Sequence, residues 1–137
     1  MGMFRNKATS YAILAATEIA RRRAGPTSPG VQAADIAQTY DLPTAYAAKI
    51  MSQLAKSQIL RSDRGPRGGF QLARAPEKIS LLEMFESVRG LISTNGIHVS
   101  GNVPDALSRT VSNAFQNANN AIRKRLGATT LADLIKK

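Results

Sequence analysis

The spacing of the apolar residues changes character near residue 59. Before that point, three segments (residues 8–23, 33–40 and 43–58) carry apolar residues at helical spacing. After it, residues 59–62 and 70–74 have the composition of short strands and flank a turn rich in glycine and proline. A helix, a short helix, a third helix and then a β-hairpin is the order of a winged helix-turn-helix domain. We therefore expect a mainly α fold with a small β-hairpin.

The third helical segment carries the surface that such a domain uses for recognition. Leu42-Pro43 separates it from the second segment, and proline suits the first turn of a helix. Its apolar residues repeat on one face and include Tyr46, which we expect in the core rather than stacked on a base. A helix-turn-helix places the N-terminal residues of its second helix against base edges in the major groove. Thr44, Ala45 and Lys49 are therefore predicted to contact DNA there.

The charge of the chain indicates a polyanionic partner. Its 137 residues contain 19 Lys and Arg against 9 Asp and Glu, which gives a net charge of +10 and a pI near 10.7. Such a surplus favours nucleic acid as the partner, although it could also serve solubility alone. Residues 49–78 hold seven basic and two acidic residues, so half of the net charge lies on the third helix and the hairpin. Arg5 and Lys7, just before the first helix, are expected to contact phosphates.

The glycines of the hairpin turn do not match a nucleotide-binding loop. A P-loop requires Gly-Lys followed by Ser or Thr, whereas phenylalanine follows the two adjacent glycines of this turn. A dinucleotide fingerprint joins a strand to a helix, and this turn joins two predicted strands. Glycine allows close approach to another surface, and a narrow minor groove attracts arginine. If the turn is not merely solvated, it contacts the minor groove or the DNA backbone through Arg64, Gly65, Arg67, Gly68 and Gly69.

The residues that catalysis requires are absent. The only histidine, His98, lies in an irregular segment with no acidic residue nearby in the sequence. Glu83 and Glu86 are three residues apart, but Glu83 is explained as a helix cap. The absence of cysteine excludes a disulfide, a thiolate zinc site and a cysteine-ligated iron–sulfur cluster. We expect no enzymatic activity, no metal site and no cofactor, and the role of His98 stays open.

Nothing in the chain indicates export or insertion into a membrane. No apolar run is long enough to span a bilayer, and the N-terminal residues lack the apolar stretch of a secretory signal. We expect a cytoplasmic protein.

Three more helices are predicted after the hairpin. Ser80-Leu81-Leu82-Glu83 matches a capping box and begins a helix that we expect to end at Gly90. Pro104 begins a long helix that we expect to end at Gly127. Thr130-Leu131-Ala132-Asp133 is a second capping-box match and begins a short last helix.

The long helix indicates an assembly of two chains. We expect residues 1–90 to form the DNA-binding domain, and residues 91–137 to hold an irregular loop, the long helix and the last helix. An apolar stripe on the long helix must be covered by the rest of the domain or by a second copy. Helix-turn-helix proteins usually bind paired half-sites as two-fold dimers, so we assign the stripe to a homodimer interface. The stripe consists of Leu107, Val111, Ala114, Phe115, Ala118 and Ile122.

These elements resemble the Rrf2 family of bacterial transcription regulators over nearly the whole chain. Residues 61–74, RSDRGPRGGFQLAR, are close to the wing signature of the family, which is its most specific segment. The other similar segments, in the order of the family, are Tyr11-Ala12, Ala34-Asp35-Ile36-Ala37, Leu42-Pro43-Thr44-Ala45-Tyr46, residues 79–90 and residues 130–134. The resemblance implies a winged-helix DNA-binding domain, a long dimerisation helix and control of transcription at operator sites, which we take to be repression.

The chain departs from the family in two respects. Many members carry three cysteines between the fourth helix and the long helix, which hold an iron–sulfur cluster or sense redox state. Residues 91–103 occupy this place here and contain no cysteine, and Arg89 replaces a residue that is usually acidic. The effector is unknown, and a small molecule bound near residues 91–103 is our suggestion. Two other functions stay open: a winged-helix scaffold that binds a protein partner, and sequence-independent binding of nucleic acid.

Overall fold

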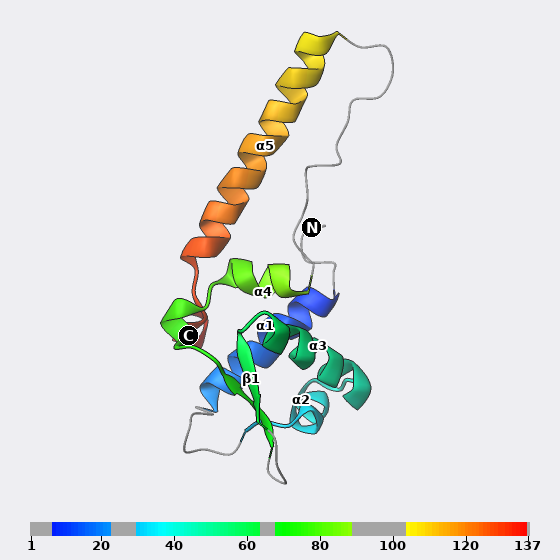
Figure 1. The fold of residues 1–137 in the computed structure, drawn as a ribbon, viewed down its shortest axis with the longest axis vertical. Coiled ribbons are helices and arrows are strands. Elements are labelled where there is room, and N and C mark those ends of the chain that lie inside the picture. Colours follow the sequence, from blue (N-terminus) through cyan, green and yellow to red (C-terminus); the bar gives the residue numbers. More distant parts are fainter. Residues whose placement is uncertain (1–6, 23–29, 64–67, 89–103, 137) are drawn as a thin grey trace.

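The computed structural model describes residues 7–22, 30–63, 68–88 and 104–136, which form helices and one small hairpin (Figure 1). The predicted fold class is confirmed, because the described ranges are mainly helical and their two strands pair as an antiparallel hairpin. A short 3-10 helix, η2, follows the hairpin and is not among the predicted elements. In chain order, the elements are α1 (Lys7–Arg21), α2 (Ala33–Tyr40), α3 (Thr44–Lys56), β1 (Leu60–Asp63), β2 (Gly69–Leu72), η2 (Pro76–Lys78), α4 (Leu81–Ser87), α5 (Asp105–Ala128) and α6 (Leu131–Ile135).

A single β-bridge joins the hairpin to the residues before α2. Leu60 pairs with Leu72 and Asp63 pairs with Gly69 in the antiparallel register of β1 and β2. Val31 then bridges Phe70: its N–H donates to the Phe70 carbonyl at 2.9 Å, and the Phe70 N–H donates back at 2.8 Å. These bonds attach the start of the helix-turn-helix to the wing.

Two glycines make this close approach possible. A Cβ on Gly69 would lie 2.8 Å from the carbonyl carbon of Gly30, and a Cβ on Gly30 would meet the carbonyl carbon of Gly69 at the same distance. Real Cβ atoms do not approach backbone this closely, so both positions require glycine.

The turn of the helix-turn-helix is closed by a left-handed residue. Asp41 has φ 54°, and the N–H of Leu42 donates to the Ala37 carbonyl at 2.8 Å. Pro43 then serves as the N-cap of α3 rather than lying inside its first turn, where we predicted it. The fixed φ of proline still suits the start of the helix.

A second left-handed residue ends α3. Gln58 has φ 62°, and its N–H donates to Ala55 at 3.0 Å while the N–H of Ile59 donates to Leu54 at 3.0 Å. This pair of hydrogen bonds is a Schellman motif, and the buried Ile59 and Leu54 supply its apolar contact. The motif turns the chain directly from the recognition helix into the wing.

Replacing Gln58 with glycine is expected to raise the free energy of unfolding by roughly 0.5–1 kcal/mol, because glycine adopts a positive φ without steric cost. Urea denaturation followed by circular dichroism measures the change. The control is Ser57→Gly, since Ser57 has an ordinary φ of −88° and glycine there only adds freedom to the unfolded chain. Equal effects of the two substitutions would show that Gln58 is not strained.

Both predicted capping boxes are present, and they lie side by side. The Ser80 hydroxyl accepts from the N–H of Glu83, and the Thr130 hydroxyl accepts from the N–H of Asp133. Ser80 and Thr130 themselves form an antiparallel bridge, which joins the start of α4 to the start of α6. Two segments fifty residues apart in the chain thus begin their helices together.

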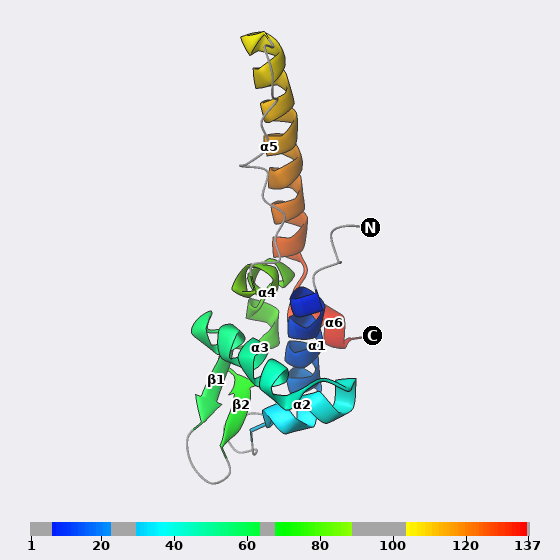
Figure 2. The same ribbon diagram turned by 90° about the vertical axis from the view of Figure 1, so that its right-hand side faces the viewer.

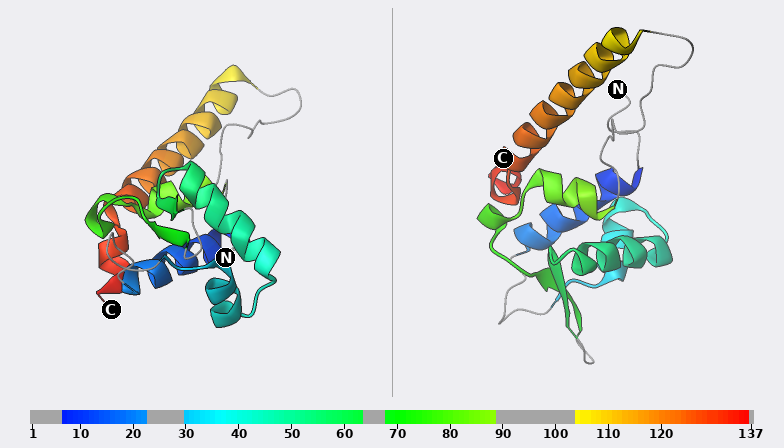
Figure 3. Two further views of the ribbon diagram at one scale, coloured as in Figure 1. Left: turned by 60° about the horizontal axis from the view of Figure 1, so that its bottom comes forward. Right: turned by 45° about the horizontal axis from the view of Figure 1, so that its top comes forward.

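The last helix belongs to the core of the winged helix. Leu131 is fully buried in the same cluster as Ile19 of α1 and Met51 of α3. Figure 2 and Figure 3 show α6 against α1. The predicted boundary at residue 90 therefore separates α6 from the elements on which it packs.

The long helix α5 extends away from this core, and none of its residues is buried (Figure 1). It passes through Gly127 and ends at Ala128, within two residues of the predicted end. Contacts with α4 hold its C-terminal part: Nη2 of Arg123 lies 3.3 Å from Oε1 of Glu86, and Leu82 lies over Gly127. Within the described ranges, no helix combines the length and apolar character that crossing a membrane requires.

Candidate nucleic-acid interface

The recognition helix α3 has one buried face and one exposed face. Its buried residues, which pack on the core, are Ala47, Ile50, Met51 and Leu54. Thr44, Ala45 and Lys49, the three predicted DNA contacts of this helix, all lie exposed. Ser52 and Lys56 continue the same face toward the C-terminal end of the helix. The face offers hydroxyls, a methyl group and ammonium groups, which suit thymine methyls, single hydrogen bonds and phosphates.

Tyr46 packs in the protein, as predicted. Its ring meets the ring of Tyr11 edge to face, with the centroids 5.9 Å apart and the planes at 89°. Both residues are partly buried against the core. The pair fixes the start of α3 on α1, and leaves the opposite face of α3 open.

The wing lies beside α3, at the end of the molecule opposite to the tip of α5 (Figures 1 and 2). Arg61 of β1 faces its register partner Gln71, whose buried Oε1 accepts a hydrogen bond from Nη2 of Arg61. Nε of Arg61 also lies 3.6 Å from Oδ1 of Asp63, yet about half of the arginine side chain stays exposed. The two contacts orient Arg61 on the surface of the hairpin without burying its charge.

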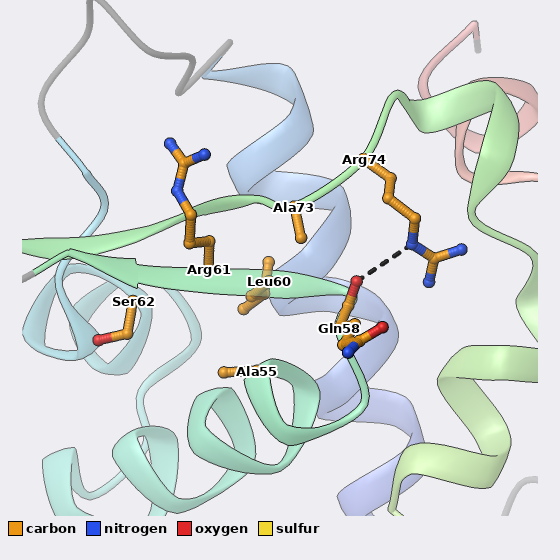
Figure 4. Close-up of a pocket in the computed structure, with 7 residues that line it drawn as sticks. All are labelled: Ala55, Gln58, Leu60, Arg61, Ser62, Ala73 and Arg74. Carbon is orange, nitrogen blue, oxygen red and sulfur yellow. Dashed lines mark hydrogen bonds between the residues drawn. The ribbon is translucent and has the colours of Figure 1, made fainter.

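A shallow cleft of about 430 Å³ separates the end of α3 from the base of the hairpin (Figure 4). Ala55 lies on the helix side, while Leu60 and Ala73 lie on the hairpin side. Arg74 reaches across the edge of this cleft and donates to the Gln58 carbonyl (Figure 4). The complete lining is Ala55, Gln58, Leu60, Arg61, Ser62, Ala73 and Arg74.

The predicted contacts of the wing and the N-terminus are only partly within the described ranges. Gly68 is partly buried beside β2, and Lys7 is exposed at the start of α1. Gly69 is buried against Gly30, so we withdraw it from the proposed DNA contacts. The predictions that fall outside the described residues are those for Arg5, Arg64, Gly65, Arg67 and His98.

The structure adds three candidates that the sequence reasoning did not select. Ser52 and Lys56 lie on the exposed face of α3, and helical spacing from Lys49 was the signal that could have identified them. Arg61 is exposed on β1, and its place depends on the register of the hairpin, which the sequence did not reveal.

The predicted dimer residues share one face of α5. Val111 and Ile122 are half-buried, whereas Leu107 is 48% exposed and Phe115 is 41% exposed. Ala114 and Ala118, which are also exposed, complete the stripe. The described part of the single chain therefore leaves much of this apolar surface uncovered.

The model of the Rrf2 family, described as iron-dependent transcriptional regulators, matches residues 5–137. The chain belongs to the Rrf2 family. A provisionally named HTH-type transcriptional regulator of Aquifex aeolicus is 36% identical over 76 residues, which are 56% of this chain and 50% of that relative. IscR of Cereibacter sphaeroides, an HTH-type transcriptional regulator, is 28% identical over 77% of this chain and 70% of its own length. The chain spans about half the length of the first two curated relatives that it matches.

Solved structures have the same fold. CymR of B. subtilis, titled the global cysteine regulator, superposes with a TM-score of 0.72 over 96% of this chain and 95% of its own, at 22% identity. A regulator from Listeria innocua superposes with a TM-score of 0.76 over 96% of this chain and 85% of its own, at 27% identity. The family and these relatives are regulators rather than enzymes, in agreement with the sequence, which lacks a catalytic constellation.

The family description raises the question of iron, and the residues of this chain do not fit a cluster held by thiolates. The chain contains no cysteine. In the part of the chain that the structure describes, no three His, Asp or Glu side chains gather in a group that could hold a metal ion. A cluster held by cysteine thiolates is therefore excluded for this chain.

Proposed function

We propose that this protein is a sequence-specific, DNA-binding repressor of transcription that acts as a homodimer without a cysteine-ligated cluster. The observation that carries the proposal is the exposed polar and basic face of α3 beside a basic wing, in a chain of the Rrf2 family. Its proposed partner, duplex DNA, places it in the cytoplasm.

The recognition helix is proposed to lie in the major groove. Thr44 and Ala45 stand at its start, where a helix-turn-helix meets base edges, and Lys49 follows one turn later. None of these side chains forms the two-point contacts that arginine or asparagine makes with a base, so shape readout by the wing contributes to specificity. Arg64, Gly65, Arg67 and Gly68 are proposed to contact the minor groove or the backbone, and Arg5 and Lys7 to contact phosphates.

The homodimer is proposed to form through α5. The stripe on this helix is apolar and mostly exposed, and alanines in it allow two helices to approach closely. A two-fold symmetric homodimer would present its two copies of α3 to DNA half-sites separated by about one helical turn.

The test is selection of bound fragments from genomic or random DNA, followed by competition. A specific repressor keeps its selected fragment in the presence of excess random duplex, and lowers expression of a reporter placed behind that fragment. Equal competition by random duplex would favour sequence-independent binding. Lack of affinity for any duplex would favour the alternative of a scaffold that binds a protein.

Lys49→Ala is expected to weaken operator binding and to reduce the slope of log Kobs against log[salt] by about two for the homodimer, because each of its two subunits loses one phosphate contact and releases one counterion fewer. Arg67→Ala is expected to act in the same direction. Fluorescence anisotropy at several salt concentrations measures both quantities. The matched control is Lys136→Ala, which removes the same charge from the residue after α6, far from α3 in sequence. An unchanged affinity and slope for Lys49→Ala would remove that residue from the interface.

A further inference from the structure

Arg74, two residues after the end of β2, uses all three nitrogens of its guanidinium within the protein. Nε donates to the Gln58 carbonyl at 3.1 Å, and Nη1 donates to the Lys78 carbonyl at 2.9 Å. Nη2 lies 2.9 Å from Oε1 of Glu83. The planar fork of arginine is suited to hold several acceptors at once.

The three acceptors belong to different elements. Gln58 is the left-handed residue that ends α3, and Lys78 is the last residue of η2. Glu83 lies in the first turn of α4, where its other oxygen accepts the N–H of Ser80 at 2.9 Å. Arg74 therefore connects the end of the recognition helix, the exit of the wing and the start of α4.

The carboxylate of Glu83 is kept charged for this contact. Burial by itself would raise the pKa of Glu83, but hydrogen bonds from the Ser80 backbone and from Arg74 lower it below its ordinary value. The positive charge of Arg74 consequently faces a carboxylate, and its donors are directed at carbonyls. These contacts engage three of the five N–H donors of Arg74, and one further N–H stays on each of Nη1 and Nη2.

A shallow cleft lies beside this connection, between Ala55 of α3 and Leu60 and Ala73 of the hairpin (Figure 4). The hydrogen bond from Arg74 to Gln58 crosses the edge of that space.

We propose that Arg74 is a positioning residue for DNA binding, which holds the end of α3 and the base of the wing in a fixed relation and does not itself contact DNA. The inference rests on the proposed function. The count of charges alone would instead treat Arg74 as a DNA contact, because it is one of the seven basic residues in the segment 49–78.

The experiment compares Arg74→Ala, Arg74→Lys and Glu83→Gln with the wild-type chain on the selected operator over a series of salt concentrations. Each variant is expected to bind roughly tenfold more weakly, as loss of charge-assisted hydrogen bonds implies, with an unchanged salt slope. Lysine is expected to fail because it is a point charge that cannot serve three acceptors. Glu83→Gln is the sharpest variant, because it makes the surface more basic and yet is expected to weaken binding.

Hydrogen exchange provides a measurement that does not involve DNA. Arg74→Ala is expected to speed exchange of the Ile59 and Ala73 amides, whose hydrogen bonds join the end of α3 to the wing, while the core of α1 stays protected. Lys49→Ala serves as the control. It is expected to reduce the salt slope of operator binding and to leave hydrogen exchange of the Ile59 and Ala73 amides unchanged.

The outcomes separate the two proposals. Wild-type affinity for Arg74→Lys, or a slope reduced by about two for the homodimer in Arg74→Ala, would show that Arg74 contacts phosphate. Unweakened binding by Glu83→Gln would show that the carboxylate does not hold Arg74 in place. Each of these results would overturn the inference alone. Unchanged exchange at Ile59 and Ala73 would also overturn it. A wild-type chain that binds no duplex would refute the proposed function, and with it the role of Arg74 in DNA binding.

Discussion

A Gly69→Ala variant is expected to lose roughly 1–3 kcal/mol of its free energy of unfolding, the range typical of an overpacked site. The added Cβ would lie 2.8 Å from the carbonyl carbon of Gly30, and backbone cannot move aside as a flexible side chain can. Relief of this clash would break the two hydrogen bonds between Val31 and Phe70, which attach the start of the helix-turn-helix to the wing. Thermal or urea denaturation gives the loss, and operator affinity is expected to fall as well.

The same chemical change elsewhere in the chain is the control. Gly127→Ala places a Cβ at 3.8 Å from Leu82, which is an ordinary contact, and Gly127 lies within α5. Alanine favours a helix over glycine by about 1 kcal/mol, so this variant is expected to be as stable as the wild type or more stable. Gly30→Ala is expected to act like Gly69→Ala, and the double variant to cost less than the sum, because both changes disrupt one contact. A stable Gly69→Ala protein would contradict the close approach of the two segments.

Replacing both Val111 and Phe115 with glutamate is expected to convert the protein to monomers, because a dimer would have to bury four charges without partners. Operator affinity is expected to fall by about a hundredfold or more, since each half-site is then bound independently. Analytical ultracentrifugation measures the assembly. The winged helix is expected to stay folded, because neither residue is part of its core.

The control for this experiment is the pair Gln116→Glu and Asn120→Glu. Both residues are exposed on another face of α5, have the same spacing as Val111 and Phe115, and change the net charge equally. This pair is expected to keep the dimer, and to weaken DNA binding only by its effect on net charge. Persistent dimers in the Val111 and Phe115 variant would place the interface elsewhere in the chain.

The candidate interface could be predicted in part from the sequence. Helical spacing placed Ala45 and Lys49 on the side of α3 opposite its buried residues, and Thr44 was selected because it begins the helix; the structure leaves all three exposed. The count of basic residues in the wing region was a less reliable guide to DNA contacts, because it gave Arg61 and Arg74 the same weight. Arg61 stays half-exposed on the hairpin, whereas Arg74 is held by two carbonyls and a carboxylate. Sequence shows how many charges are present, but not which of them the fold itself uses.

Features that depend on neighbours in the chain followed from the sequence alone. The capping boxes at Ser80 and Thr130 form between residues three apart, and the alternation of buried and exposed residues in α3 follows from the helical period. The sequence also excludes thiolate ligands, because it contains no cysteine.

Features that join distant segments were decided only by the tertiary structure. Gly69 was predicted to approach DNA, whereas it approaches the backbone of Gly30. The last helix was grouped with the long helix, yet its Leu131 is in the core of the winged helix. The physical reason is one of range: a cap or a helical period is fixed by hydrogen bonds within one turn, whereas the role of a glycine, an arginine or a terminal helix depends on which remote segment packs against it.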